Sequence, residues 1–152
     1  RANGVKVVED WEMAYFTEFS GSSGRGLHPL VVSYSSSPTA EVIFADEPLD
    51  TSPTGSIVAP GTCFRQVEFV GILRDTPNRD LAESWIDFML STTFQEDVPM
   101  QMFVFPVNPS AGLPVEFVQY AQIADQPVFV DPSDIAARRE EWIEAWTTTV
   151  LR

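Results

Sequence analysis

Three large aromatic residues lie near the ends of the strands that the sequence predicts. Trp11 follows a β-branched run at residues 5–8, and Tyr34 ends the apolar run at residues 30–34. Phe103 lies in an apolar, extended segment that ends near a proline. In open α/β sheets, ligands bind beyond the carboxyl ends of the strands, and aromatic faces at that edge suit a flat or cationic ligand. The alternative for each ring is an ordinary place in the core.

A run of serines precedes a predicted helix start. Ser37 stands directly before Pro38, so the pair is typical of an N-cap followed by proline in the first turn. Hydroxyls and free backbone N–H groups at such a place, here from Ser36 and Ser37, can hold an anion. Simple N-capping is the alternative interpretation.

The residues for acid–base or metal chemistry are scarce. His28 is the only histidine and Cys63 the only cysteine, which excludes an intramolecular disulfide, a thiolate cluster and a zinc site with two histidines within these residues. No third group that would orient a Cys–His pair is evident. The sequence therefore predicts no catalytic residue, no metal site and no cofactor, so we expect the chain not to be an enzyme.

The composition is that of a folded, acidic domain. The chain has 152 residues, of which 9 are Lys or Arg and 22 are Asp or Glu, so its formal charge is −13. Its 4 Trp, 3 Tyr and 11 Phe are too many for a disordered acidic tail. A single lysine and eight arginines do not supply the basic face that nucleic-acid binding needs. No apolar run is long enough to span a membrane as a helix.

Strand-like and helix-like segments alternate along the chain, which favours an α/β fold. Strands are predicted at residues 5–8, 30–34, 64–73 and 100–107, and helices at residues 9–19, 37–44, 81–89, 94–97, 114–121 and 132–150. Asp131 is the predicted N-cap of the last helix. The chain begins with Arg1 rather than Met, which we interpret as a processed product or a fragment.

Several stretches together resemble the thiamine-binding solute-binding proteins of bacterial ABC importers. The stretches are LVVSYSSSP (30–38), CFRQVEFVGIL (63–73), AESWIDFMLSTTFQEDVP (82–99), MFVFPVNPSAGLP (102–114) and AARREEWIEAWTTTVLR (136–152). The resemblance implies the type II periplasmic-binding-protein fold, a two-lobed α/β clamshell with mixed sheets flanked by helices. It also implies that the chain is the C-terminal portion. Residues 1–60 would end the second lobe, and residues 61–152 would return through the hinge to the remainder of the first lobe and the C-terminal helices.

The resemblance also implies a site and a function. Trp11, Tyr34 and Phe103 match positions at which the family holds its ligand, and Ser36 and Ser37 lie where a phosphate would fit. The implied protein binds thiamine or a thiamine phosphate between two lobes and delivers it to a membrane permease. It would be a monomer when full length, located in the periplasm or on the extracellular face of the cytoplasmic membrane.

Other functions stay open from the sequence. One alternative is a binding protein for another small cation, either a polyamine or ferric ion. A second alternative is a non-catalytic interaction domain.

Overall fold

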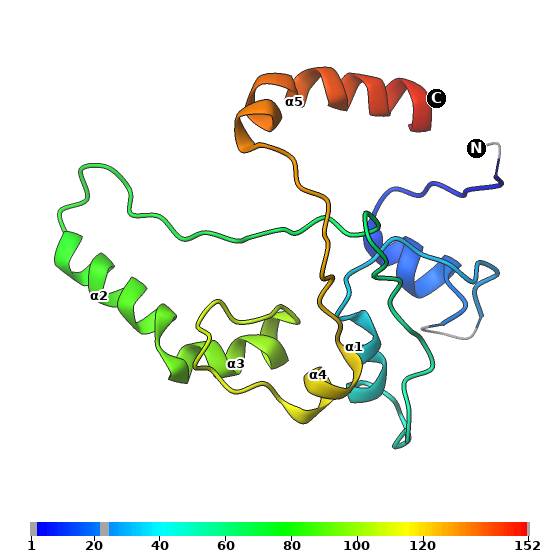
Figure 1. Ribbon diagram of the computed structural model, residues 1–152, viewed down its shortest axis with the longest axis horizontal. Coiled ribbons are helices and arrows are strands. Elements are labelled where there is room, and N and C mark those ends of the chain that lie inside the picture. Colours follow the sequence, from blue (N-terminus) through cyan, green and yellow to red (C-terminus); the bar gives the residue numbers. More distant parts are fainter. Residues whose placement is uncertain (1–2, 22–24, 152) are drawn as a thin grey trace. The chain divides into compact units, whose positions relative to one another are not determined.

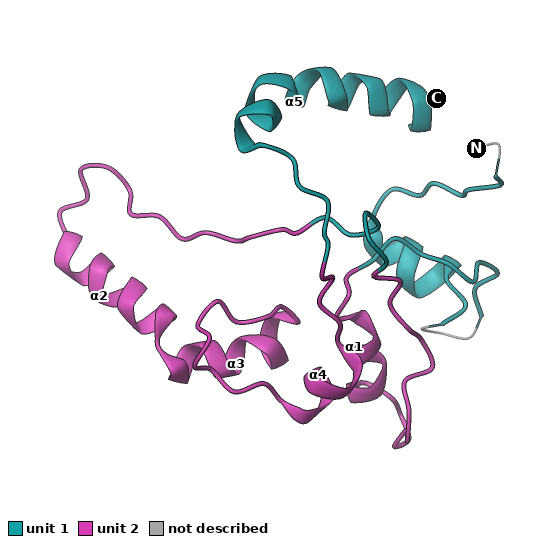
Figure 2. Ribbon diagram, in the orientation of Figure 1, with its two compact units in different colours: residues 1–33, 59–64, 126–152 teal, residues 34–58, 65–125 magenta. Residues whose placement is uncertain are grey.

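The computed structural model describes residues 3–21 and 25–151. The chain divides into two compact units, each made of segments far apart in the sequence (Figure 2). Unit 1 consists of residues 1–33, 59–64 and 126–152, and unit 2 of residues 34–58 and 65–125. The division expected at residue 60 concerns the lobes of a longer protein and stays a prediction.

Unit 1 is built around a short π-helix, η1 (Met13–Glu18), which buries Tyr15. The helix ends where the backbone N–H of Phe19 donates to the carbonyl of Ala14 at 3.0 Å, the i to i−5 bond of a π-turn. The following backbone returns alongside it, because His28 accepts from Ser20 and donates to Glu18, both at 3.0 Å. A Cβ on Gly26 would lie only 2.3 Å from the carbonyl oxygen of Phe19, so the return requires glycine at this position.

Two further elements of unit 1 lie near the C-terminus, α5 (Pro132–Trp146) and the π-helix η2 (Thr147–Leu151) (Figure 1). The predicted N-cap of α5 is confirmed, because the Asp131 carboxylate accepts from the backbone N–H of Ser133 at 2.8 Å. The Ser133 hydroxyl also donates to Asp131, and these two hydrogen bonds lower the pKa of its carboxyl. The proline in the first turn has no N–H to leave unpaired, which explains the clean start of this helix.

Unit 2 contains four helices, α1 (Ser37–Ile43), α2 (Arg79–Leu90), α3 (Thr92–Met102) and α4 (Val115–Tyr120) (Figure 1). Helix α1 lies against α4, with Thr39 of α1 and Phe117 of α4 fully buried. Helix α3 follows α2 directly, and its first turn is capped by the Ser91 hydroxyl, which accepts from the N–H of Phe94. The sequence predicted a helix only over residues 94–97, but α3 continues past Pro99 and ends at Met102.

Gln95 fixes the segment that follows α3. Its side chain is buried, and its amide nitrogen donates to the carbonyl of Met89 at 2.8 Å. Its amide oxygen accepts from the backbone N–H of Val107 at 2.7 Å. This side chain therefore ties the end of α2 to the chain beyond Phe103, and it limits where Phe103 can lie.

The predicted mixed sheets are wrong for the residues that the structure describes. Residues 5–8, 30–34 and 65–73 form neither a helix nor a strand ladder, and residues 100–102 belong to α3. The described backbone has two isolated β-bridges, Phe19 with His28 and Phe64 with Val128. The physical reason is that a β-branched run favours an extended backbone, whereas a sheet also needs a neighbouring strand to pair its N–H and C=O groups.

No helix within residues 3–21 and 25–151 is long and apolar enough to cross a membrane.

Candidate functional site

Trp11 stands in an aromatic cluster of unit 1. Its ring stacks on Tyr15 with centroids 4.9 Å apart and an interplanar angle of 24°, and it meets Phe16 edge-on at 5.6 Å. The indole N–H donates to the hydroxyl oxygen of Ser33 at 3.0 Å. The residue remains 37 % exposed. The cluster and the hydrogen bond fix the ring plane while part of its surface stays open to a ligand.

Tyr34 and Ser37 share a turn at the start of α1 in unit 2. The N–H of Ser37 donates to the carbonyl of Tyr34 at 3.0 Å. The carbonyl of Ser35 between them accepts from the Ser56 hydroxyl at 3.0 Å and from the N–H of Gln122 at 3.2 Å. The backbone of this turn is thus held on two sides, while the Tyr34 side chain is 61 % exposed.

Ser36 and Phe103 are in direct contact, although 67 residues separate them. The Ser36 hydroxyl is buried and donates to the carbonyl of Phe103 at 2.6 Å. The structure places Ser36 at the N-cap of α1, one residue before the predicted cap, but its side chain makes no capping hydrogen bond. The Ser36 hydroxyl instead donates its hydrogen bond to Phe103, the C-cap residue of α3.

The backbone of Phe103 adopts the left-handed conformation, with φ of 55°. This conformation is uncommon for a bulky residue other than glycine and costs about 1–3 kcal/mol. The hydrogen bond from Ser36 and two neighbouring rings hold it there: Phe44 lies at 5.5 Å and Phe117 at 6.3 Å between centroids. The strained backbone sets the direction of the Phe103 side chain at the end of α3.

The predicted site residues therefore fall into two groups. Tyr34, Ser36, Ser37 and Phe103 belong to unit 2, where one turn and one hydrogen bond connect them. Trp11 belongs to unit 1. Their contact with a ligand stays a prediction.

Sequence reasoning missed the residues that support the aromatic rings. Ser33 accepts the Trp11 N–H, and Phe44 and Phe117 flank Phe103. Ser33 stands next to Tyr34 in the motif already singled out, which was a usable signal. Phe44 follows α1 as its C-cap residue and Phe117 lies on α4, and their spacing in the sequence carries no such signal.

Within the described part of the chain, no three His, Cys, Asp or Glu side chains gather as a metal-binding group. His28 lies 3.9 Å from the carboxylate of Glu18, within unit 1. In each unit by itself, the candidate residues offer rings, hydroxyls and backbone groups, which can bind and orient a small molecule.

We expect Ser36→Ala to destabilise unit 2. The substitution removes a buried donor and leaves the carbonyl of Phe103 without that partner, which costs about 1–3 kcal/mol in the free energy of unfolding. Urea denaturation of the 152-residue chain, followed by far-UV circular dichroism, measures the change. Ser110→Ala is the matched control, because Ser110 is exposed and its expected effect is within about 0.5 kcal/mol. Equal effects of the two substitutions would contradict a structural role for the Ser36 hydroxyl.

Comparisons with known proteins give one consistent result. No family model and no solved structure matches the chain. A thiamine-binding periplasmic protein of Salmonella typhimurium is 32 % identical over 151 residues, and one of Escherichia coli is 29 % identical over 148 residues. A protein with the same name from Brucella suis is 24 % identical over 149 residues.

The matches cover nearly all of this chain but less than half of each relative. They include 97–99 % of the chain and 42–43 % of the relatives' lengths. The resemblance predicted from the sequence motifs is confirmed by these matches. Over almost its whole length, this chain is thus a homologue of proteins named thiamine-binding periplasmic protein.

Proposed function

We propose that the chain is part of an extracytoplasmic solute-binding protein that captures thiamine, or a thiamine phosphate, for a bacterial ABC importer. The observation that carries the proposal is the similarity over 97–99 % of the chain to relatives that are named for thiamine binding and for the periplasm. The protein would act in the periplasm or at the outer face of the cytoplasmic membrane. It would pass its ligand to a membrane permease.

The chemistry of the candidate residues supports this ligand. Thiamine carries a permanently cationic thiazolium ring and a flat aminopyrimidine. A cation over the face of an aromatic ring gains about 0.5–2 kcal/mol, and the partly exposed rings of Trp11 and Tyr34 offer such faces. Phe103 would add an apolar surface whose direction is set by its backbone and by the hydrogen bond from Ser36.

Binding of this kind needs no catalytic group. We propose that the protein is not an enzyme, that it requires neither cofactor nor metal, and that the full-length form is a monomer. The rings would orient the ligand by cation–π attraction, and the net charge of the chain, −13, favours a cationic ligand.

Ligand-dependent thermal stability tests the proposal. We expect the full-length gene product to melt at a higher temperature with thiamine, because a ligand that binds only the folded state stabilises it by about 2.7 kcal/mol at one hundred times its Kd. The same melting measurement is made with thiamine phosphate, with spermidine and with ferric citrate. A shift with spermidine or iron but none with thiamine or its phosphate would overturn the proposal and favour another cargo.

A further inference from the structure

Gln95 is a buried polar side chain that joins α3 to the backbone following it. The residue is 7 % exposed, and its amide oxygen accepts from two backbone N–H groups, that of Val107 at 2.7 Å and that of Asn108 at 3.3 Å. Its amide nitrogen donates to the carbonyl of Met89 at 2.8 Å. Both ends of the amide are thus bound to backbone groups outside α3, and losing these bonds would leave buried polar groups unpaired.

These hydrogen bonds require the chain to turn back at the end of α3. Gln95 lies about two helical turns before the last residue of the helix, Met102, so the chain must run back along α3 to bring Val107 to it. A residue in the left-handed conformation after a helix makes such a reversal. Phe103 takes this conformation here, with φ of 55°. Residues 103–108, here called the return segment, therefore begin at Phe103 and end at the Gln95 side chain.

Phenylalanine is an unusual residue for this reversal, which glycine makes most easily. A bulky residue keeps a strained backbone only where the surrounding structure holds it. The Ser36 hydroxyl holds the start of the return segment by its hydrogen bond to the Phe103 carbonyl. Phe105 holds the middle, because its ring meets Phe117 edge-on at 5.6 Å between centroids. Gln95 holds the end.

We propose that Gln95 is a positioning residue for the ligand: it holds the return segment so that the Phe103 ring has its binding direction before the ligand arrives. The side chain of Gln95 is buried and its polar groups are bound within unit 2, so it acts through Phe103 and not by touching the ligand. A ring that is ordered in advance loses little conformational entropy on binding, which raises affinity. This inference rests on the proposed function, in which Phe103 contacts the ligand.

Two substitutions of Gln95 separate its hydrogen bonds. Gln95→Met keeps the length of the side chain but removes both its donor and its acceptor. Gln95→Glu removes the donor to Met89 but keeps an oxygen that accepts from Val107 and Asn108. In calorimetric titration of the full-length gene product with thiamine, we expect Gln95→Met to raise Kd about 10-fold, and Gln95→Glu to raise it no more than about 3-fold. Equal losses in the two variants would overturn the proposal.

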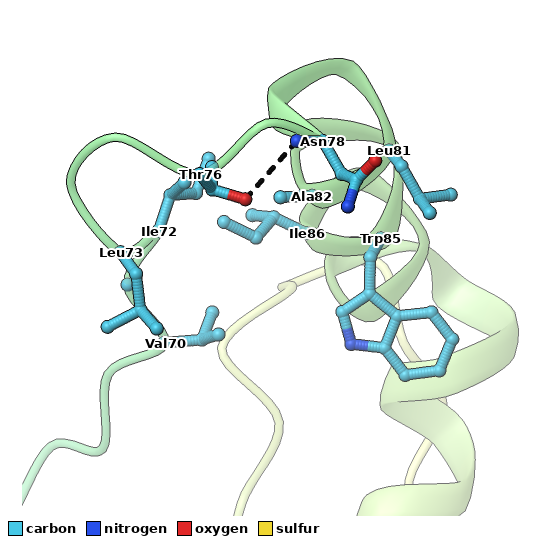
Figure 3. A pocket seen from close by; sticks show the side chains of 10 residues that line it. Val70, Ile72, Leu73, Thr76, Asn78, Leu81, Ala82, Trp85 and Ile86 are labelled. Atoms are coloured by element: carbon cyan, nitrogen blue, oxygen red, sulfur yellow. Dashed lines mark hydrogen bonds between the residues drawn. The ribbon is translucent and has the colours of Figure 1, made fainter.

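Two controls separate positioning from a general loss of stability. Gln101→Met makes the same change at an exposed position of α3, where the side chain donates to Asp97 at 3.3 Å. Trp85→Ala removes a large side chain from α2, where Trp85 lines an apolar groove with Val70 (Figure 3). We expect both controls to change Kd by no more than about 2-fold, because neither removes a contact of the return segment. A Trp85→Ala variant that bound thiamine as weakly as Gln95→Met would contradict the proposal.

A double-mutant cycle shows whether Gln95 acts through Phe103. In the Phe103→Ala background, we expect Gln95→Met to change Kd by no more than about 2-fold, because no ring remains to be positioned. A further 10-fold loss in that background, about as large as in the presence of Phe103, would overturn the proposal. An unchanged Kd in the Gln95→Met or the Phe103→Ala single variant would overturn it as well.

Hydrogen exchange without ligand distinguishes failure of this inference from failure of the proposed function. In the full-length gene product, we expect Gln95→Met to speed exchange of the Val107 and Asn108 amides at least about 10-fold, and Gln95→Glu to leave it close to that of the unsubstituted protein. Unchanged exchange in Gln95→Met would overturn the inference, whichever ligand the protein binds. Faster exchange in a protein that binds spermidine or ferric ion instead of thiamine would remove the proposed ligand alone, and the double-mutant cycle is then measured with the ligand that binds.

Discussion

Phe117→Ala is expected to lower the free energy of unfolding of unit 2 by about 3–5 kcal/mol, the range for large aromatic side chains removed from a core. Phe117 is 1 % exposed, and the rings of Phe105 and Phe103 lie 5.6 and 6.3 Å from it between centroids. Few other described side chains are fully buried, among them Thr39 and Pro99. A cavity at Phe117 therefore removes the main apolar contact between α4 and the segment after α3.

Urea denaturation of the 152-residue chain measures this effect. Val118→Ala is the matched control, because Val118 neighbours Phe117 on α4 but points to solvent, and alanine is also a good helix former. We expect the control to change stability by no more than about 0.5 kcal/mol. A Phe117→Ala variant as stable as the control would show that the core of unit 2 lies elsewhere.

The helices could be predicted because their signals are local. Asp131 with Pro132 marks the start of α5, and Pro38 marks the first turn of α1. The apolar stripe of α2 has the helical period. Each of these signals involves residues within a few positions of one another, so it holds in whatever surroundings the helix is placed.

Local signals of this kind could not tell whether a sheet forms. The run at residues 65–73 has a strand-like composition, but it forms neither a strand ladder nor a helix. Pairing, however, depends on a second strand, and no run of β-branched residues specifies where its partner lies. The fold class was therefore wrong for the described residues, although the composition of this run is typical of a strand.

The candidate site shows the same division between local and distant information. The residue types at Trp11, Tyr34 and Phe103 were visible in the sequence. The contact of Ser36 with Phe103 spans 67 positions. The left-handed backbone at residue 103 could not be predicted either, because the residue there is a phenylalanine and not a glycine or asparagine. Such contacts arise from tertiary packing, so only the structure reveals how the rings are held.

Trp11→Ala is expected to weaken thiamine binding by the full-length gene product by about 10- to 100-fold. Large aromatic side chains dominate binding energies when they are truncated, with losses of about 1.4–2.8 kcal/mol for that range. Trp11 suits this role because stacking on Tyr15 and the hydrogen bond to Ser33 fix its plane before the ligand arrives. A ring that is already ordered loses little conformational entropy on binding.

Isothermal titration calorimetry with thiamine measures the change, and two variants keep the result specific. Trp146→Ala removes another exposed tryptophan of unit 1 and is expected to leave Kd unchanged. Trp11→Phe removes the indole N–H but keeps an aromatic face, so we expect it to retain most of the affinity that Trp11→Ala loses. If Trp11→Phe bound as weakly as Trp11→Ala, the hydrogen bond to Ser33 rather than the ring face would carry the effect. If Trp11→Ala bound as tightly as Trp146→Ala, the cation–π role of Trp11 would be wrong, because the loss of its aromatic face would then have no effect on the bound thiazolium.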